Sequence, residues 1–137
     1  MLFGMKAFIL SLCALAFLLP AAPAPAETAP PPKNPVYVLP VRGQIEGALL
    51  YVLRRGLAEA ERQNAAAVVL VMDTPGGTLG AASDIVRSIQ SSKTPVYTFV
   101  EKDAFSAGAI IALSTKKIFM APGAVIGDAL PIMMSPF

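Results

Sequence analysis

The sequence predicts an α/β domain in which strands and helices alternate around a mostly parallel sheet. The segment 68–72 is apolar at every position, which is typical of a strand buried on both faces of a parallel sheet. Apolar residues recur with a helical period on either side of it, over 45–63 and 79–91. Strands that alternate with helices imply right-handed crossovers, with the helices packed on the sheet.

The first 26 residues are predicted to be a secretory signal peptide. Lys6 supplies the positive charge, 7–19 is an apolar run of the length of a signal core, and Ala24-Pro25-Ala26 fits a cleavage site. We place cleavage after Ala26, and an uncleaved membrane anchor is the alternative. The signal predicts export, with the domain on the periplasmic or extracytoplasmic face of the membrane.

Composition excludes several classes of function. The 137 residues contain no His, so neither a Ser-His-Asp triad nor a His-bearing metal site can form within them. The one cysteine, Cys13, lies in the predicted signal, where Leu12 makes it a poor lipid acceptor, so no disulfide is expected in the mature part. Lys and Arg are scattered and the net charge is only +2, which argues against nucleic acid as a partner. We expect no cofactor and no metal.

After a Pro-rich tether over 27–35, the folded domain is expected to span 36–137. The predicted elements are a strand over 36–41 that Gly43 ends, an amphipathic helix from 45 to about 63, a strand over 68–72, a loop over 75–77, a helix over 79–91, a strand over 96–100, a short apolar helix over 106–113, a strand over 118–121, a turn at 122–123 and a further element starting at 125–127. Gly56 weakens the first helix by up to ~1 kcal/mol. The apolar end, 129–137, has no closing helix, and we interpret the domain as incomplete at its C-terminus.

Two places in this pattern could carry chemistry. Ser106 begins a small-residue helix after one strand, and Gly76-Gly77 follows another, so both are expected at the same edge of the sheet. Taken alone, Ser106 is most simply a helix N-cap and the glycines a turn. Together they resemble an acyl-transfer site, because glycine lets a backbone N–H approach a ligand closely. The N–H groups of Gly77 and Ala107 could then form an oxyanion hole for a Ser106 nucleophile.

A serine nucleophile also needs a base, and none is convincing here. The candidate lysines, Lys93, Lys102, Lys116 and Lys117, are all predicted in loops or at strand edges, where they should stay solvated. A lysine acts as a base when burial lowers its pKa. Lys102 is nearest to Ser106 in sequence, and Asp103 is better explained as a loop or capping residue. The residues therefore give a nucleophile and an oxyanion hole without a base.

Three segments in order, 71–77, 105–108 and 118–127, resemble the NfeD family of membrane-bound serine peptidases, which is related to signal peptide peptidase A and the Clp proteases. The resemblance implies a Clp/crotonase-like fold of repeated β-α units. It implies a Ser-Lys dyad with Ser106 as nucleophile, Gly77 and Ala107 as oxyanion-hole donors, and Gly76 and Gly108 at the substrate. It further implies hydrophobic segments of membrane proteins as substrates, a stomatin-like protein as partner, and a homo-oligomer.

The family's lysine lies beyond the segment that matches Ile126-Gly127, and the 137 residues end before it. The chain alone is therefore expected to have little or no peptidase activity. A different hypothesis is a catalytically dead scaffold or partner-binding module on the same fold. A third is a crotonase-type acyl-CoA enzyme, which a secretory signal argues against.

Overall fold

A computed structural model of the chain describes residues 34–130. All of the described residues belong to one compact unit. The predicted signal peptide with Cys13, most of the predicted tether, and the apolar end over 131–137 lie outside the described residues.

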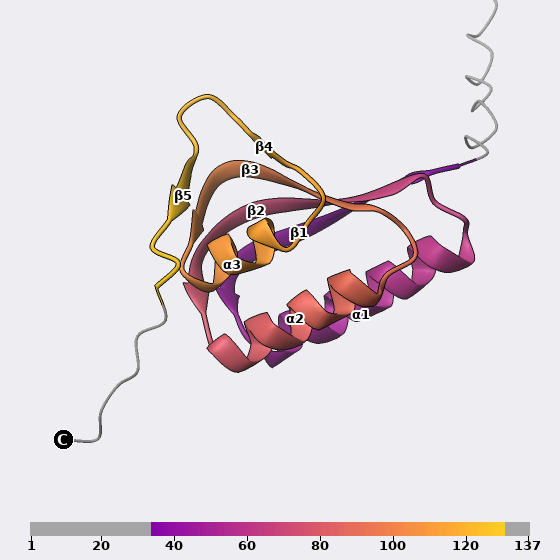
Figure 1. Cartoon of the computed structure of the whole chain (residues 1–137), viewed down its shortest axis with the longest axis horizontal. Coiled ribbons are helices and arrows are strands. Elements are labelled where there is room, and N and C mark those ends of the chain that lie inside the picture. Colours follow the sequence, from indigo (N-terminus) through magenta and orange to yellow (C-terminus); the bar gives the residue numbers. More distant parts are fainter. Residues whose placement is uncertain (1–33, 131–137) are drawn as a thin grey trace, which may run out of the picture. The chain divides into compact units, whose positions relative to one another are not determined.

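Strands and helices alternate along this unit as the sequence predicts (Figure 1). The elements are β1 (Val36–Ile45), α1 (Gly47–Arg62), β2 (Ala67–Gly77), α2 (Leu79–Ser91), β3 (Val96–Phe105), α3 (Ala107–Leu113), β4 (Ile118–Met120) and β5 (Val125–Gly127). The sheet has the order β1-β2-β3-β4, and β5 pairs with β3 farther along the same strand. Every pair is parallel, which confirms the predicted α/β class.

The three long strands extend well beyond their predicted ends. β1 runs through Gly43, which adopts a positive φ of 68° where the pairing register with β2 shifts, so Gly43 marks a bulge rather than the end of the strand. β2 continues to Gly77, through the predicted loop over 75–77, although the predicted strand ends at 72. β3 continues to Phe105, although the predicted strand ends at 100. Pairing with the neighbouring strands holds these polar and glycine-rich residues extended.

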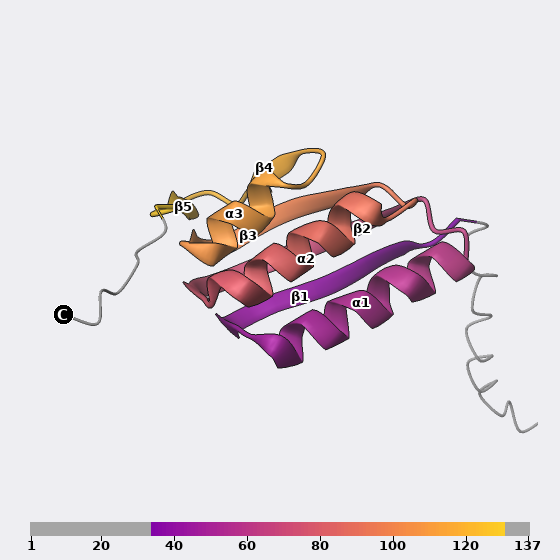
Figure 2. The same cartoon turned by 60° about the horizontal axis from the view of Figure 1, so that its bottom comes forward.

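The core lies between one face of the sheet and the helices, and Figure 2 shows α1 and α2 running side by side over that face. Alternate residues of β2 point into it, so that Val68, Leu70 and Met72 are fully buried. They meet helix residues such as Leu53 of α1 and Ile85 of α2. Burial of each such side chain contributes about 1.5–3 kcal/mol, so this interface anchors the strands whose ends form the site.

Gly56 has a packing role within α1. A Cβ at this position would lie 2.6 Å from Cδ2 of Leu39, so the glycine makes room for the Leu39 side chain of β1 against the helix. The propensity cost of the glycine is thereby offset by contact between α1 and β1.

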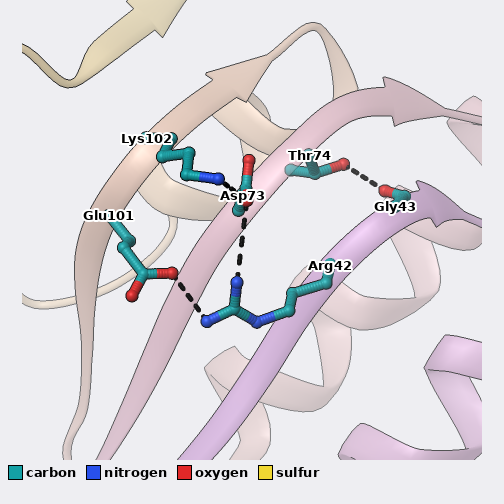
Figure 3. A network of polar contacts seen from close by, with 6 residues as sticks. All are labelled: Arg42, Gly43, Asp73, Thr74, Glu101 and Lys102. Atoms are coloured by element: carbon teal, nitrogen blue, oxygen red, sulfur yellow. Dashed lines mark hydrogen bonds and ion pairs between the residues drawn. The ribbon is translucent and has the colours of Figure 1, made fainter.

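The other face of the sheet carries a row of charges (Figure 3). Arg42 of β1 pairs with Asp73 of β2 at 3.6 Å and with Glu101 of β3 at 2.6 Å. Lys102 pairs with the same Asp73 at 3.4 Å. The side chains are partly to largely exposed, so the row ties the three strands together only weakly. Over residues 34–130, none of the helices has the length and apolar character needed to cross a membrane.

Candidate active site

Ser106 occupies a strained backbone position between β3 and α3. Its φ is 51° and its ψ is −118°, a conformation that residues other than glycine rarely adopt. Its N–H donates to the Gly127 carbonyl at 3.0 Å, and its own carbonyl accepts from the Ile110 N–H at 3.2 Å. The side chain makes no capping hydrogen bond to the helix. The expectation of an ordinary N-cap is therefore wrong for the hydroxyl, although the residue does stand at the N-cap position.

The surrounding structure holds this strain in place from both sides. On the strand side, Ala104 and Phe105 pair with Ile126 and Gly127 of β5. On the helix side, Ala107 is buried in the core. A residue fixed at both neighbours keeps a backbone conformation that it would otherwise leave, and such positions are concentrated at active sites.

Gly76 lies directly against Ser106. A Cβ at Gly76 would come 2.8 Å from Cβ of Ser106, 3.3 Å from its Oγ and 3.0 Å from the Phe105 carbonyl oxygen. The φ of Gly76 is 107°, so both its backbone and its surroundings require glycine. The structure thus brings together the two places that the sequence predicted at one edge of the sheet.

Gly77 is packed on the backbone of β1, where a side chain would overlap the Ile45 carbonyl group. That carbonyl accepts a 2.9 Å hydrogen bond from the N–H of Thr78. In a parallel ladder, the residue before such a donor directs its own N–H to the opposite edge of the strand. The Gly77 N–H therefore points away from β1, toward the side on which β3 and Ser106 lie.

The two residues after Ser106 are buried. Ala107 opens α3, where the first N–H groups of a helix have no partner within the helix. Gly108 faces β2, and a Cβ there would come 2.6 Å from Cγ2 of Thr74. Any contact between Gly108 and a substrate would accordingly be made by its backbone.

The candidate bases do not gather at Ser106 within residues 34–130. Lys102 is 70% exposed and ion-paired with Asp73. Asp103 is a strand residue of β3 paired with Val125, so its expected place in a loop or cap is wrong. The remaining candidates, Lys93, Lys116 and Lys117, precede β3 and β4 and lie at the opposite end of these strands. None of them has the burial and placement that a lysine base needs.

Thr74 is a site residue that the sequence reasoning missed. It is fully buried, and its hydroxyl donates to the Gly43 carbonyl at 2.6 Å while accepting from the Gly76 N–H at 3.1 Å. Its position continues the buried alternation of 68, 70 and 72 along β2. That alternation could have predicted a buried Thr74. The Pro-Gly-Gly that follows predicted a loop instead, so the strand was not extended to this residue.

The alternating strands and helices around a parallel sheet give the domain a ClpP-like fold. A ClpP1 mutant from Listeria monocytogenes superposes with a TM-score of 0.62 at 21% identity, over 65% of this chain and 53% of that one, a likeness of fold. The family model for the NfeD1b N-terminal domain matches residues 35–135. The chain belongs to this family.

Two curated relatives support the family assignment. The membrane-bound protease PH1510 of Pyrococcus horikoshii is 41% identical over 132 residues, which is 94% of this chain and 28% of the relative. Membrane protein NfeD1b of Bacillus subtilis is 39% identical over 126 residues, 92% of this chain and 28% of the relative. The chain thus spans less than a third of the length of either protein.

Two solved structures of the 1510-N membrane-bound stomatin-specific protease share the fold closely. A serine-to-alanine mutant gives a TM-score of 0.71 at 42% identity and covers 74% of this chain and 51% of that one. A lysine-to-alanine mutant in complex with a substrate peptide gives 0.70 at 43% identity and covers 73% and 47%. The chain is therefore homologous to a protease for which a serine and a lysine were the residues chosen for mutation.

Proposed function

We propose that the chain carries the nucleophile and the oxyanion hole of a serine endopeptidase of the Ser-Lys type. The observation that carries this proposal is the backbone conformation of Ser106 and the freedom of its hydroxyl. Its backbone is held at positive φ, its hydroxyl is not used as a helix cap, and the bare α-carbon of Gly76 lies against it. This arrangement leaves the hydroxyl free to attack a peptide carbonyl.

The N–H groups of Gly77 and Ala107 are the proposed oxyanion-hole donors. When Oγ of Ser106 adds to the carbonyl carbon, negative charge develops on the carbonyl oxygen, and donors about 3 Å from that oxygen stabilise it. The direction of the Gly77 N–H, away from β1, and the place of Ala107 in the first turn of α3 support these roles. Gly76 and Gly108 would present backbone to the substrate.

The base is proposed to be a lysine from outside residues 34–130. It would accept the Oγ proton as the ester bond forms and pass a proton to the leaving amine as the C–N bond breaks, after which water hydrolyses the acyl-enzyme. In the 1510-N mutants, the lysine follows the serine at a spacing that, counted from Ser106, falls beyond Phe137. We accordingly expect little peptide cleavage from the 137-residue chain alone.

The proposed substrates are hydrophobic segments of membrane proteins, with a stomatin-like protein as substrate or partner. Support comes from the relative, which is described as stomatin-specific and membrane-bound. We further propose that the domain acts as a homo-oligomer on the extracytoplasmic face of the membrane, as a secretory signal would place it.

Labelling of the active-site serine tests the proposal. The complete gene product, incubated with a fluorophosphonate probe, should be labelled at Ser106, and Ser106→Ala should abolish the labelling. The 137-residue chain assayed alone should cleave apolar peptides poorly. Efficient cleavage by that chain, lost in Ser106→Ala, would show that a base is present within it.

The alternative function is a catalytically dead scaffold or partner-binding module. It predicts that the complete gene product is folded but that Ser106 does not react with the probe. That result would reject the peptidase proposal while leaving the family assignment intact.

A further inference from the structure

Thr74 is a buried polar residue to which the proposed chemistry gives no role. It lies in β2 two residues before Gly76, and its hydroxyl makes two hydrogen bonds, one to the Gly43 carbonyl and one from the Gly76 N–H. Figure 3 shows the first of these, which joins β2 to the bulge in β1. A buried hydroxyl costs free energy unless it is bonded, and this one both donates and accepts.

The methyl group of the same side chain contacts a different element. The α-carbon of Gly108 faces Cγ2 of Thr74, which fills the space that a side chain on Gly108 would need. The methyl group thus sets how closely the start of α3 approaches β2. One side chain therefore contacts both the glycine-rich end of β2 and the helix that follows Ser106.

We propose that Thr74 is a positioning residue for the candidate active site. Its hydroxyl orients the peptide group of Gly76, and so the direction of the Gly77 N–H that follows. Its methyl group seats α3, whose first residue supplies the Ala107 N–H. The inference rests on the proposed function, because an oxyanion hole needs both donors fixed relative to Ser106 before the reaction starts.

Two substitutions test the hydroxyl and the methyl group of Thr74 separately. Thr74→Val keeps the shape and the methyl contact with Gly108 but leaves the Gly76 N–H and the Gly43 carbonyl without their partner. Thr74→Ser keeps the hydroxyl and removes the methyl group. Thr98→Val is a matched control, because Thr98 is also fully buried and its hydroxyl also accepts a hydrogen bond, from Thr115 at 3.1 Å. It lies in β3 beside the start of β4, far along the strand from Ser106.

The experiment measures two quantities on the complete gene product. These are the hydrogen–deuterium exchange of the segment 73–78 and the rate at which the fluorophosphonate labels Ser106. Thr74→Val should speed the exchange and slow the labelling, each by about tenfold or more, since buried groups lose their hydrogen bonds. Thr74→Ser should leave the exchange of 73–78 near that of the unmodified protein, because the hydroxyl is kept. It should slow the labelling less than Thr74→Val does, because only the methyl contact that seats α3 is lost. Thr98→Val should change neither rate, because the Thr115 hydroxyl keeps its hydrogen bond to the Ala112 carbonyl and the substitution lies far from 73–78.

The positioning role is rejected if Thr74→Val and Thr98→Val give the same exchange and labelling. If the unmodified protein is not labelled at all, the peptidase proposal fails, and exchange alone then decides the role of Thr74. Should Thr74→Val not fold, Thr74→Ser decides, because fast exchange over 73–78 in that variant would show that the hydroxyl does not hold the end of β2.

Discussion

At the scale of single residues, the candidate site depends on backbone conformations and contacts that come from distant parts of the chain. In the sequence, Ser106 and Gly76 stand out because each lies among small residues next to a predicted strand or helix. Nothing in the sequence reveals that Ser106 has a φ of 51°, because that strain comes from pairing with β5 and burial of the next residue. The same holds for Thr74, whose partners come from β1 and α3.

The strain at Ser106 predicts that glycine at this position gives a more stable protein than alanine does. Ser106→Gly should be more stable than Ser106→Ala by about 0.5–2 kcal/mol, because glycine relieves the strained φ and alanine retains it. Neither variant should react with a fluorophosphonate. Chemical denaturation of the two variants measures the difference.

Ser106→Ala is the matched control for that comparison, since both variants lack the hydroxyl. Equal unfolding free energies would mean that the backbone at this position is not strained in solution.

At the scale of elements, the predicted order of strands and helices is confirmed and several boundaries are wrong. The order follows from hydrophobic periodicity, which each segment carries by itself. The ends of β2 and β3 depend on neighbours instead, because Thr74 pairs with Ala104 and Gly77 pairs with Ile45 across the sheet. Polar and glycine-rich stretches such as 73–77 are extended only where such partners exist.

The contact between α1 and β1 predicts a coupling between Gly56 and Leu39. In the unmodified protein, Gly56→Ala should gain up to ~1 kcal/mol of helix propensity and lose part of that gain by displacing the Leu39 side chain. In a Leu39→Ala background the clash is absent, so the same substitution should keep the whole gain. The four proteins of this double-mutant cycle, compared by urea denaturation, should show a coupling of about 0.5–3 kcal/mol. Additive effects would show that α1 and β1 are not in close contact at this point.

At the scale of the whole molecule, the two faces of the sheet differ. The helices cover one face (Figure 2). The other face shows a row of charges and a set of apolar side chains that are exposed or partly buried, namely Val36, Val38, Val69, Val71, Tyr97, Phe99 and Phe119. The sequence did not reveal this asymmetry, because the unbroken apolar run of β2 predicts burial on both faces. Exposed apolar surface of this kind favours association.

Val38 offers a direct test of how this face behaves, because it is 61% exposed and lies on the edge strand β1. Val38→Lys should reduce self-association of the chain, since a lysine on an exposed edge strand opposes pairing with another copy. It should change the free energy of unfolding by no more than about 0.5 kcal/mol, as is usual for surface substitutions. Sedimentation velocity over a range of concentrations measures the first effect and thermal unfolding the second.

Tyr51→Lys is the control, because Tyr51 is similarly exposed but lies on α1. If Tyr51→Lys reduces association as much as Val38→Lys does, added charge alone explains the effect and the open face of the sheet has no part in it.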